Sequence, residues 1–293
     1  MLKGVITKGI GGFYYIDTQN GIYECRARGK FRKEKITPLV GDYVGISLLD
    51  EKNKKGSLDE IFPRKNALIR PRVSNVDQGV IVFAAKSPDI NLDLLDRFIV
   101  LLEEQDLDIL ICINKIDLDE KEDYKKIVSL YENAGYKIIP ISTYKKTNIN
   151  YIKEALKDKI SVFAGPSGVG KSSLINILNP ELSLTTGEIS AKVGRGKHTT
   201  RHAELMQIFE GGFIVDSPGF MSLLLSHIEP DNLQFYFREF EPYLNNCRFL
   251  GCKHINEPDC CIKAHVGKEI DEGRYKKYVS LFNEVTEERK NIL

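Results

Sequence analysis

Short stretches of alternating apolar and polar residues fill the first part of the chain and are separated by glycines. They lie within residues 1–64 and are rich in the β-branched and aromatic residues that favour strands. Strands this short are expected to close into a small all-β barrel of the OB type, because closure removes exposed sheet edges. The expected strands have the sequences LKGVITK, GFYYIDT, GIYECRA, DYVGISL and SLDEIF.

The pattern changes at about residue 73, where continuous apolar runs begin to alternate with stretches of helical periodicity. One helix is expected over residues 92–105, where Leu92, Leu95, Ile99 and Leu102 share a face. Alternation of this kind predicts a doubly wound α/β sheet of parallel strands, with binding sites at the carboxyl ends of the strands. The expected strands are VDQGVIVFAA, DILICIN, KIIPIS and SVFAG, with further helices near residues 121–134 and 148–158.

After about residue 222 the chain is expected to be mainly helical, interrupted by a cysteine-rich loop. Leu233, Phe237 and Phe240 have helical spacing, and a final amphipathic helix is expected around Tyr275, Tyr278, Val279 and Phe282. The chain is therefore predicted to be multidomain. The predicted domains are an RNA-binding OB barrel at 1–68, an α/β domain at 69–222 and a helical domain at 223–293.

The amino-acid composition is that of an ordinary soluble globular protein and does not by itself indicate a function. Of the 293 residues, 28% are charged and 42% hydrophobic, and the formal net charge is +1. Any affinity for nucleic acid must therefore come from a local patch. No signal peptide or apolar run of membrane-spanning length is evident. We expect a cytoplasmic monomer without a membrane association.

One such patch is a basic loop between the third and fourth expected strands. Glu34 is its only acidic residue. A solvated surface loop is the simpler interpretation, but a concentration of positive charge on an OB-type barrel favours contact with a polyanion such as RNA. The basic residues are Arg26, Arg28, Lys30, Arg32, Lys33 and Lys35.

The sequence from Gly165 to Ser172 matches the phosphate-binding P-loop pattern and lies between an expected strand and an expected helix. Glycines let backbone N–H groups curl around a phosphate, and the following helix directs its positive end at the same anion. Lys171 is expected to reach the β- and γ-phosphates, and the Ser172 hydroxyl to bind Mg²⁺. The expected nucleotide-binding residues here are Gly165, Pro166, Ser167, Gly168, Val169, Gly170, Lys171, Ser172 and Ser173.

A D-x-x-G motif, Asp216 to Gly219, follows the strand-like GGFIV. Its carboxylate is expected in the Mg²⁺ shell, and the Gly219 amide is placed to sense the γ-phosphate. Between the two motifs, residues 194–201 have the composition of a switch segment, in which a threonine hydroxyl completes the coordination of Mg²⁺. Thr199 and Thr200 both qualify, and Thr200 is preferred.

The sequence Asn114-Lys115-Ile116-Asp117 ends the expected strand DILICIN. A carboxylate at Asp117 can accept hydrogen bonds from the N1–H and exocyclic amine of guanine, and adenine offers no such pair of donors. Asn114 is expected to brace the loop and the Lys115 stem to pack over the base. Ser142 and Thr143 are expected to brace Asp117 and to offer a backbone N–H to the guanine oxygen.

The order of these motifs is reversed relative to an ordinary small GTPase, in which the phosphate loop precedes N-K-x-D. The separations within each half are ordinary, so the simplest explanation is a circular permutation of one site. We expect Asp117 and Lys171 to reach opposite ends of one GTP or GDP molecule. The segment after Asp216 then leads directly into the C-terminal region, which should respond to movement of residues 194–222.

Four residues near the C-terminus match the spacing of a metal site. Cys247, Cys252, His254 and Cys260 supply three thiolates and an imidazole, a closed set suited to one structural Zn²⁺. Cys261 could take the fourth position instead of Cys260, which is preferred. The remaining cysteines, Cys25 and Cys112, lie in strand-like runs and are expected to be buried as small hydrophobic residues.

Taken together, the barrel, the permuted order NKID–GPSGVGKSS–GKHTT–DSPG and the C-x4-C-x-H-x5-C cluster resemble the RsgA (YjeQ/YloQ) family over essentially the whole chain. The resemblance implies a GTPase that binds the small ribosomal subunit and its rRNA, assists its late maturation and is stimulated by it. Phe220 follows D-x-x-G where many GTPases have a water-orienting glutamine, so intrinsic hydrolysis should be slow. The resemblance assigns to His198 the role of the missing catalytic group. Lys171 and Thr200, identified above from their motifs, are the other expected catalytic residues.

Other function classes are weighed against this one. A P-loop kinase of metabolism is disfavoured by the N-K-x-D and D-x-x-G motifs. A nucleotide-switched RNA-binding module with negligible hydrolysis remains the alternative, because Phe220 cannot polarise water.

Overall fold

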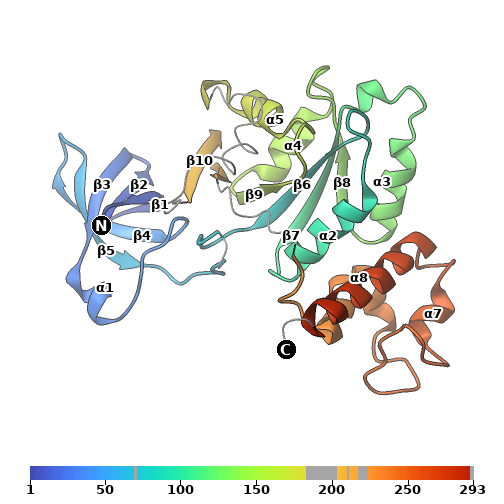
Figure 1. Ribbon diagram of the computed structural model, residues 1–293. Coiled ribbons are helices and arrows are strands. Elements are labelled where there is room, and N and C mark those ends of the chain that lie inside the picture. The colour runs from blue at the N-terminus through green and yellow to red at the C-terminus, as the bar shows by residue number, and fades with distance from the viewer. Residues whose placement is uncertain (69–70, 183–202, 210, 217–223, 291–293) are drawn as a thin grey trace. The chain divides into compact units, whose positions relative to one another are not determined.

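The computed structural model describes residues 1–68, 71–182, 203–209, 211–216 and 224–290. The chain divides into two compact units, each built from two separated stretches of sequence. Met1–Gly79 and Asn150–Met221 make up the first unit, and Val80–Ile149 and Ser222–Leu293 make up the second. The three predicted domain boundaries stay predictions. Figure 1 shows the helices and strands of the chain, coloured from the N-terminus to the C-terminus.

The first unit begins with the barrel, which has the expected OB-type order. Strand β1 pairs with both β2 and β4, while β3 pairs with β2 and β5 and β5 pairs with β4, so the ladder closes on itself. Alternate residues such as Ile6, Ile16, Ile46 and Leu58 are fully buried inside it. The elements are β1 (Leu2–Ile10), β2 (Phe13–Thr18), β3 (Gly21–Ala27), a short helix α1 (Gly29–Lys33), β4 (Tyr43–Asp50) and β5 (Lys55–Ile61).

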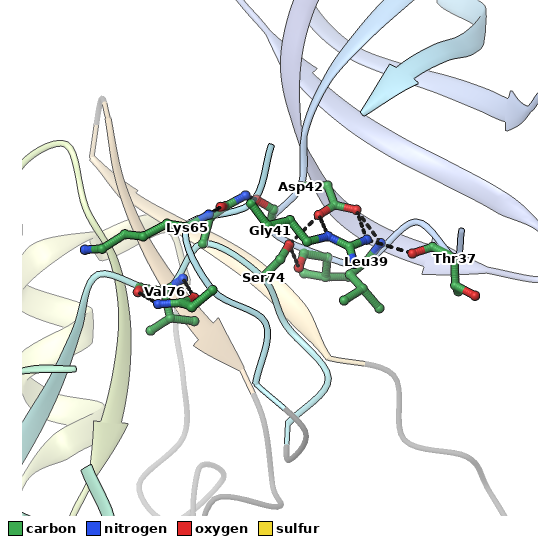
Figure 2. Close-up of polar contacts among 11 residues, drawn as sticks. Thr37, Leu39, Gly41, Asp42, Lys65, Ser74 and Val76 are labelled. Atoms are coloured by element: carbon green, nitrogen blue, oxygen red, sulfur yellow. Dashed lines mark hydrogen bonds and ion pairs between the residues drawn. The ribbon is translucent and has the colours of Figure 1, made fainter. Parts of the chain in front are cut away.

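Buried polar contacts attach the segment after the barrel to the loop that precedes β4 (Figure 2). The fully buried Asp42 carboxylate accepts hydrogen bonds from the Leu39 amide at 2.7 Å, the Ser74 hydroxyl at 2.6 Å and the Arg64 guanidinium at 2.6 and 2.8 Å. Gly41 has a φ of +90°, and a Cβ there would lie 2.1 Å from the Ser74 carbonyl oxygen. Only glycine allows the two segments to approach this closely.

The same unit contains the strands that carry the phosphate loop and Asp216. Strand β9 pairs in parallel with β11, and β11 pairs antiparallel with β10. The barrel joins this ladder through β1, where Lys8 lies opposite Glu204 and its Nζ is 2.9 Å from the Glu204 carboxylate. The elements are α4 (Ile149–Leu156), β9 (Ile160–Ala164), α5 (Lys171–Leu178), η2 (Pro180–Leu182), β10 (Glu204–Phe209) and β11 (Gly212–Asp216).

In the second unit, buried strands carry the N-K-x-D loop. Strand β7 pairs in parallel with β8, and Ile111 and Ile113 of β7 are fully buried. Helix α2 buries Leu95, Ile99 and Leu102, as its periodicity predicts. Asn91 stands at its N-cap, where the side chain accepts a hydrogen bond from the Leu94 amide. The elements are β6 (Gln78–Ala84), α2 (Leu92–Glu103), β7 (Asp108–Asn114), η1 (Ile116–Leu118), α3 (Tyr124–Asn133) and β8 (Lys137–Pro140).

The C-terminal region belongs to this second unit and shares a core with α2. Val100 and Leu101 of α2 pack in one cluster with buried residues such as Phe237, Phe240 and Tyr278. The expected helix around Leu233 consists of two 3-10 segments, which the extended residue Phe237 separates. The elements are η3 (Pro230–Tyr236), η4 (Arg238–Tyr243), α7 (Cys261–His265) and α8 (Glu272–Lys290).

A buried ion network ties α8 to the rest of the second unit. The Arg274 guanidinium donates to Glu239 of η4 at 2.7 and 3.0 Å and to Asp96 of α2 at 2.6 Å. Because Arg274 is only 2% exposed, this pairing compensates for the loss of its hydration. Within the described ranges, no helix is both long and apolar enough to cross a membrane.

Candidate functional site

The phosphate-binding loop connects β9 to α5 in the first unit. Gly165, Gly168 and Gly170 have φ values of +132°, +80° and +97°, which residues with a Cβ rarely adopt. Val169 is buried and anchors the loop, and Gly170 stands at the N-cap of α5. The local backbone therefore has the glycine-dependent turn that the P-loop pattern predicts, leading into the N-terminus of a helix.

Lys171 is the first residue of α5 and is almost fully buried, with 4% of its surface exposed. Its Nζ donates to the carbonyl oxygens of Gly165 at 2.8 Å and Pro166 at 2.6 Å, across the mouth of the loop. Burial lowers the pKa of Lys171 to about 8. A phosphate group would supply the negative charge that this ammonium needs.

The backbone of Asp216 lies at the same end of the sheet as the phosphate loop. Strands β9 and β11 run parallel in register, with Val162 opposite Val215, and each ends within two residues of that pair. Parallel neighbours bring their carboxyl ends to one edge, so the D-x-x-G motif begins beside the P-loop. The side chain of Asp216 and the predicted residues His198, Thr199, Thr200, Gly219 and Phe220 lie outside the described residues.

The N-K-x-D loop, in the second unit, is joined to the loop after β8 by the side chain of Asn114. This residue is fully buried, and its Oδ1 accepts hydrogen bonds from the Lys115 amide at 2.8 Å and the Thr143 amide at 3.0 Å. One side chain thus holds two loops that are separated by 29 residues of sequence. Asn114 occupies the bracing position that its place at the end of DILICIN indicates.

Asp117 is held by the second of these loops. The Ser142 hydroxyl donates to Asp117 Oδ1, and the Lys145 amide donates to the Ser142 Oγ at 2.9 Å. The carboxylate therefore has a fixed orientation, and among the described residues no side chain or amide donates a hydrogen bond to its other oxygen. Lys115 adopts a left-handed backbone with φ of +60°, and its Nζ donates to the Ser87 carbonyl. The N-K-x-D motif does not predict this contact with Ser87.

The structure brings Cys247, Cys252, His254 and Cys260 together, with all four ligand atoms within 4.8 Å of one another. The Sγ atoms of Cys247 and Cys260 are 3.9 Å apart, and His254 Nδ1 is 3.5 and 3.3 Å from them. Tetrahedral bonds of about 2.3 Å to sulfur and about 2.0 Å to nitrogen separate ligand atoms by similar distances. The donor set therefore fits a zinc ion.

The chemistry of the cluster agrees with this fit. Burial raises the pKa of the Cys252 thiol to about 12 and also raises that of Cys260. Buried thiolates need a cation to compensate their charge, and a coordinated metal deprotonates them. Cys261 lies outside the cluster, because Cys260 is the extended residue before α7 and Cys261 starts the helix. Only its backbone amide contributes, 3.3 Å from Cys247 Sγ.

Two residues near the cluster were not suggested by the motif. Gln234 of η3 has its Oε1 2.8 Å from His254 Nε2, and the Tyr275 hydroxyl donates to the His254 carbonyl at 2.7 Å. Gln234 precedes the first cysteine of the motif by 13 residues. It belongs to no metal-binding spacing pattern, so the sequence alone does not identify it. Tyr275 is marked in the sequence only as part of an apolar helix face.

Comparison with known proteins gives family matches over nearly the whole chain. Residues 61–226 match the family model described as RsgA GTPase, and residues 3–57 match the RsgA N-terminal domain. The first model begins where the barrel ends and continues through both candidate loops. The second covers the barrel as far as the first residues of β5.

Curated relatives and solved structures agree with these matches. A protein of Alkaliphilus metalliredigens named small ribosomal subunit biogenesis GTPase RsgA is 47% identical, covering 99% of this chain and 100% of its own length. Its namesake in Caldanaerobacter subterraneus is 48% identical, covering 99% of this chain and 97% of its own. The crystal structure of YloQ, described as a circularly permuted GTPase, superposes with a TM-score of 0.82 at 39% identity, covering 98% and 96% of the two chains. YjeQ from Thermotoga maritima gives a TM-score of 0.82 at 37% identity, covering 97% and 98%. The family models include both candidate loops and most of the barrel, and the relatives match nearly the whole chain. The chain therefore belongs to the RsgA family of GTPases.

Proposed function

We propose that this protein hydrolyses GTP to GDP and phosphate and assists late maturation of the small ribosomal subunit. The observation that carries the guanine assignment is the hydrogen bond from Ser142 to Asp117, together with the buried Asn114 that joins their loops. A carboxylate held in this way is preorganised to accept the N1–H and amine of guanine. ATP would leave it without those donors, which is unfavourable for a desolvated acceptor. Lys115 would pack its stem over the base, and Thr143 would lie near the guanine oxygen.

The phosphate end of the nucleotide is assigned to the loop from Gly165 to Ser173. The glycine backbone and the N-terminus of α5 support this assignment, since both direct N–H groups at an anion. On binding, the Lys171 ammonium would leave the loop carbonyls for the β- and γ-phosphates. Ser172 would bind Mg²⁺ directly and Asp216 through a water molecule, and the ion would neutralise charge on the phosphates during transfer.

Catalysis beyond this electrostatic contribution is assigned to the segment before β10. Phe220 follows D-x-x-G and has no polar group for orienting water, so intrinsic hydrolysis is expected to be slow. His198 would orient or polarise the attacking water, and Thr200 would complete the Mg²⁺ shell when GTP is bound. The small subunit would accelerate turnover by stabilising this arrangement.

The barrel is assigned to rRNA of the small subunit. The basic side chains between Arg26 and Lys35 are exposed. The Arg28 guanidinium is 2.7 Å from the Asp59 carboxylate, and Arg26, near the end of β3, lies over Phe13 with its guanidinium carbon 4.5 Å from the ring centroid. Exposed cations can pair with the phosphates of an RNA backbone. An arginine that lies on an aromatic ring offers a flat surface on which an adjacent base can stack. Affinity for the subunit should therefore fall steeply with salt concentration. Because the relatives are named for ribosomal subunit biogenesis, we place the protein in the cytoplasm. A monomer is the simplest oligomeric state and is proposed on that ground alone.

The cysteine and histidine cluster is assigned to one structural Zn²⁺. Four protein ligands leave no open position for water, so the ion would stabilise the fold and take no part in hydrolysis.

The experiment that tests this function is phosphate release from GTP with and without purified small subunits, at several salt concentrations. We expect slow release by the protein alone and a large, salt-sensitive stimulation by subunits. His198→Ala should abolish most of the stimulation and leave GTP affinity nearly unchanged. Absence of stimulation, with intact GTP and subunit binding, would instead favour a nucleotide-switched RNA-binding module.

A further inference from the structure

The His254 ring presents its two nitrogen atoms to different partners. Nδ1 faces the thiols, at 3.3 Å from Cys260 Sγ and 3.5 Å from Cys247 Sγ. Nε2 faces away from them and lies 2.8 Å from the side-chain oxygen of Gln234. The ring is 2% exposed, so neither nitrogen can exchange its partner for bulk water without rearrangement.

The orientation of the Gln234 amide is fixed by its own second hydrogen bond. Its Nε2 donates to the Asp231 carbonyl oxygen at 2.8 Å within η3. Turning the amide over would place Oε1 against that carbonyl, with two acceptors facing each other and no hydrogen between them. Oε1 must therefore point at His254. Because Oε1 can only accept, the hydrogen in this contact must belong to His254 Nε2.

A neutral imidazole carries one hydrogen, so a protonated Nε2 leaves the lone pair on Nδ1. Nδ1 is the nitrogen that faces the cysteines. We propose that Gln234 selects this tautomer and that His254 binds the metal through Nδ1, which makes Gln234 a positioning residue of the metal centre. The inference rests on the proposed zinc site and adds to it the ligand atom and the residue that orients it.

Other contacts hold the backbone of His254 but do not fix the orientation of its ring. Hydroxyls of α8 fix the backbone, with Tyr275 donating to the His254 carbonyl and Tyr278 to the Lys253 carbonyl, both at 2.7 Å. His254 itself has a left-handed φ of +61°. These interactions place the residue, but within the described chain only Gln234 makes a hydrogen bond with Nε2. Loss of such a partner typically weakens metal binding by about 10- to 100-fold.

The ligand atom can be read directly by NMR of protein labelled with ¹⁵N-histidine and loaded with zinc. We expect the His254 signals of a metal-bound Nδ1 and a protonated Nε2, with a long-lived Nε2–H resonance. In Gln234→Met that resonance should broaden or shift, since the side chain keeps its length and loses its acceptor. Coordination through Nε2 in the unaltered protein would overturn the inference while leaving the zinc site in place.

Zinc affinity provides a second readout, measured by competition with a chromophoric chelator. Gln234→Met should bind zinc about 10- to 100-fold more weakly. Gln234→Glu should bind it more tightly than Gln234→Met, because a carboxylate also accepts the Nε2–H, but less tightly than the unaltered protein, because its second oxygen faces the Asp231 carbonyl. Asn232→Ala, an exposed neighbour in η3, is the matched control and should be unchanged.

The outcomes separate this inference from the zinc assignment. Equal affinity and equal His254 spectra in Gln234→Met and the control would show that Gln234 does not position the ring. Loss of affinity in Gln234→Glu equal to that in Gln234→Met would also contradict the acceptor role. Absence of zinc binding by the unaltered protein would overturn the metal site and the inference together. Should Gln234→Met fail to fold, the spectra of the unaltered protein still decide the ligand atom.

Discussion

Arg64 donates two hydrogen bonds to the carboxylate of Asp42, from Nε at 2.6 Å to one oxygen and from a terminal nitrogen at 2.8 Å to the other. Asp42 is fully buried, whereas Arg64 retains contact with solvent. This bidentate pair joins the segment after the barrel to the loop before β4. The same segment continues to Asp77, which exchanges hydrogen bonds of 2.8 Å with Ile160 at the start of β9.

Asp42→Asn is therefore expected to destabilise the first unit. The amide keeps the shape of the side chain but lacks the charge, and its nitrogen cannot accept the hydrogen bonds that one carboxylate oxygen now receives. We expect a loss of about 1–3 kcal/mol in the free energy of unfolding. Urea denaturation followed by tyrosine fluorescence measures it, with the exposed Glu51→Gln as control. Equal midpoints for the two variants would refute the structural role of Asp42.

Binding of nucleotide is expected to take up protons near pH 8. Burial lowers the pKa of Lys171 to about 8 in the nucleotide-free protein, and a bound phosphate would raise it again. The free protein thus holds fewer protons than the complex once pH approaches 8, so affinity should fall as pH rises further.

Calorimetry of GDP binding in buffers of different ionisation enthalpy measures this uptake. We expect a net uptake of protons that is larger at pH 8 than at pH 7. Lys171→Arg provides a comparison, since a guanidinium stays charged throughout this range. A proton count of zero at pH 8 in the unaltered protein would show that Lys171 does not change its environment on binding.

Removal of zinc is expected to loosen the C-terminal region without abolishing nucleotide binding. The metal would link Cys247, Cys252 and Cys260, and metal binding is coupled to the local fold around such ligands. Hydrogen exchange of residues 224–290 should rise after chelation, while GDP still binds. Unchanged protection throughout this region in verified zinc-free protein would contradict a structural role for the ion.

Much of the fold follows from local patterns. Alternation of apolar residues predicts the barrel strands, and Cys25 and Cys112 are buried within strands as expected, at 1% and 0% exposure. The nucleotide motifs are recognisable because each is a short run of chain with a fixed backbone requirement. Lys171, for example, is identified by the glycines that precede it.

Contacts between distant segments could not be predicted in this way. Asp42 meets Ser74 across 32 residues, and Gln234 meets His254 across 20, and neither pair has a periodic or motif signature. The choice between Cys260 and Cys261 likewise depends on where α7 begins, since adjacent residues at a helix start point in different directions. The helix predicted around Leu233 is instead divided into two 3-10 segments at the extended residue Phe237, a break that the spacing of the apolar residues does not indicate.

The central claim is that Asp117 makes the nucleotide site specific for guanine, and isothermal titration of GTP, ATP and XTP tests it most directly. The unaltered protein should bind GTP and show no measurable affinity for ATP. In Asp117→Asn the preference for GTP should disappear and XTP should bind, because an amide N–H can donate to the xanthine oxygen that replaces the guanine amine. Equal binding of GTP and ATP by the unaltered protein, or an undiminished preference for GTP in Asp117→Asn, would contradict the account.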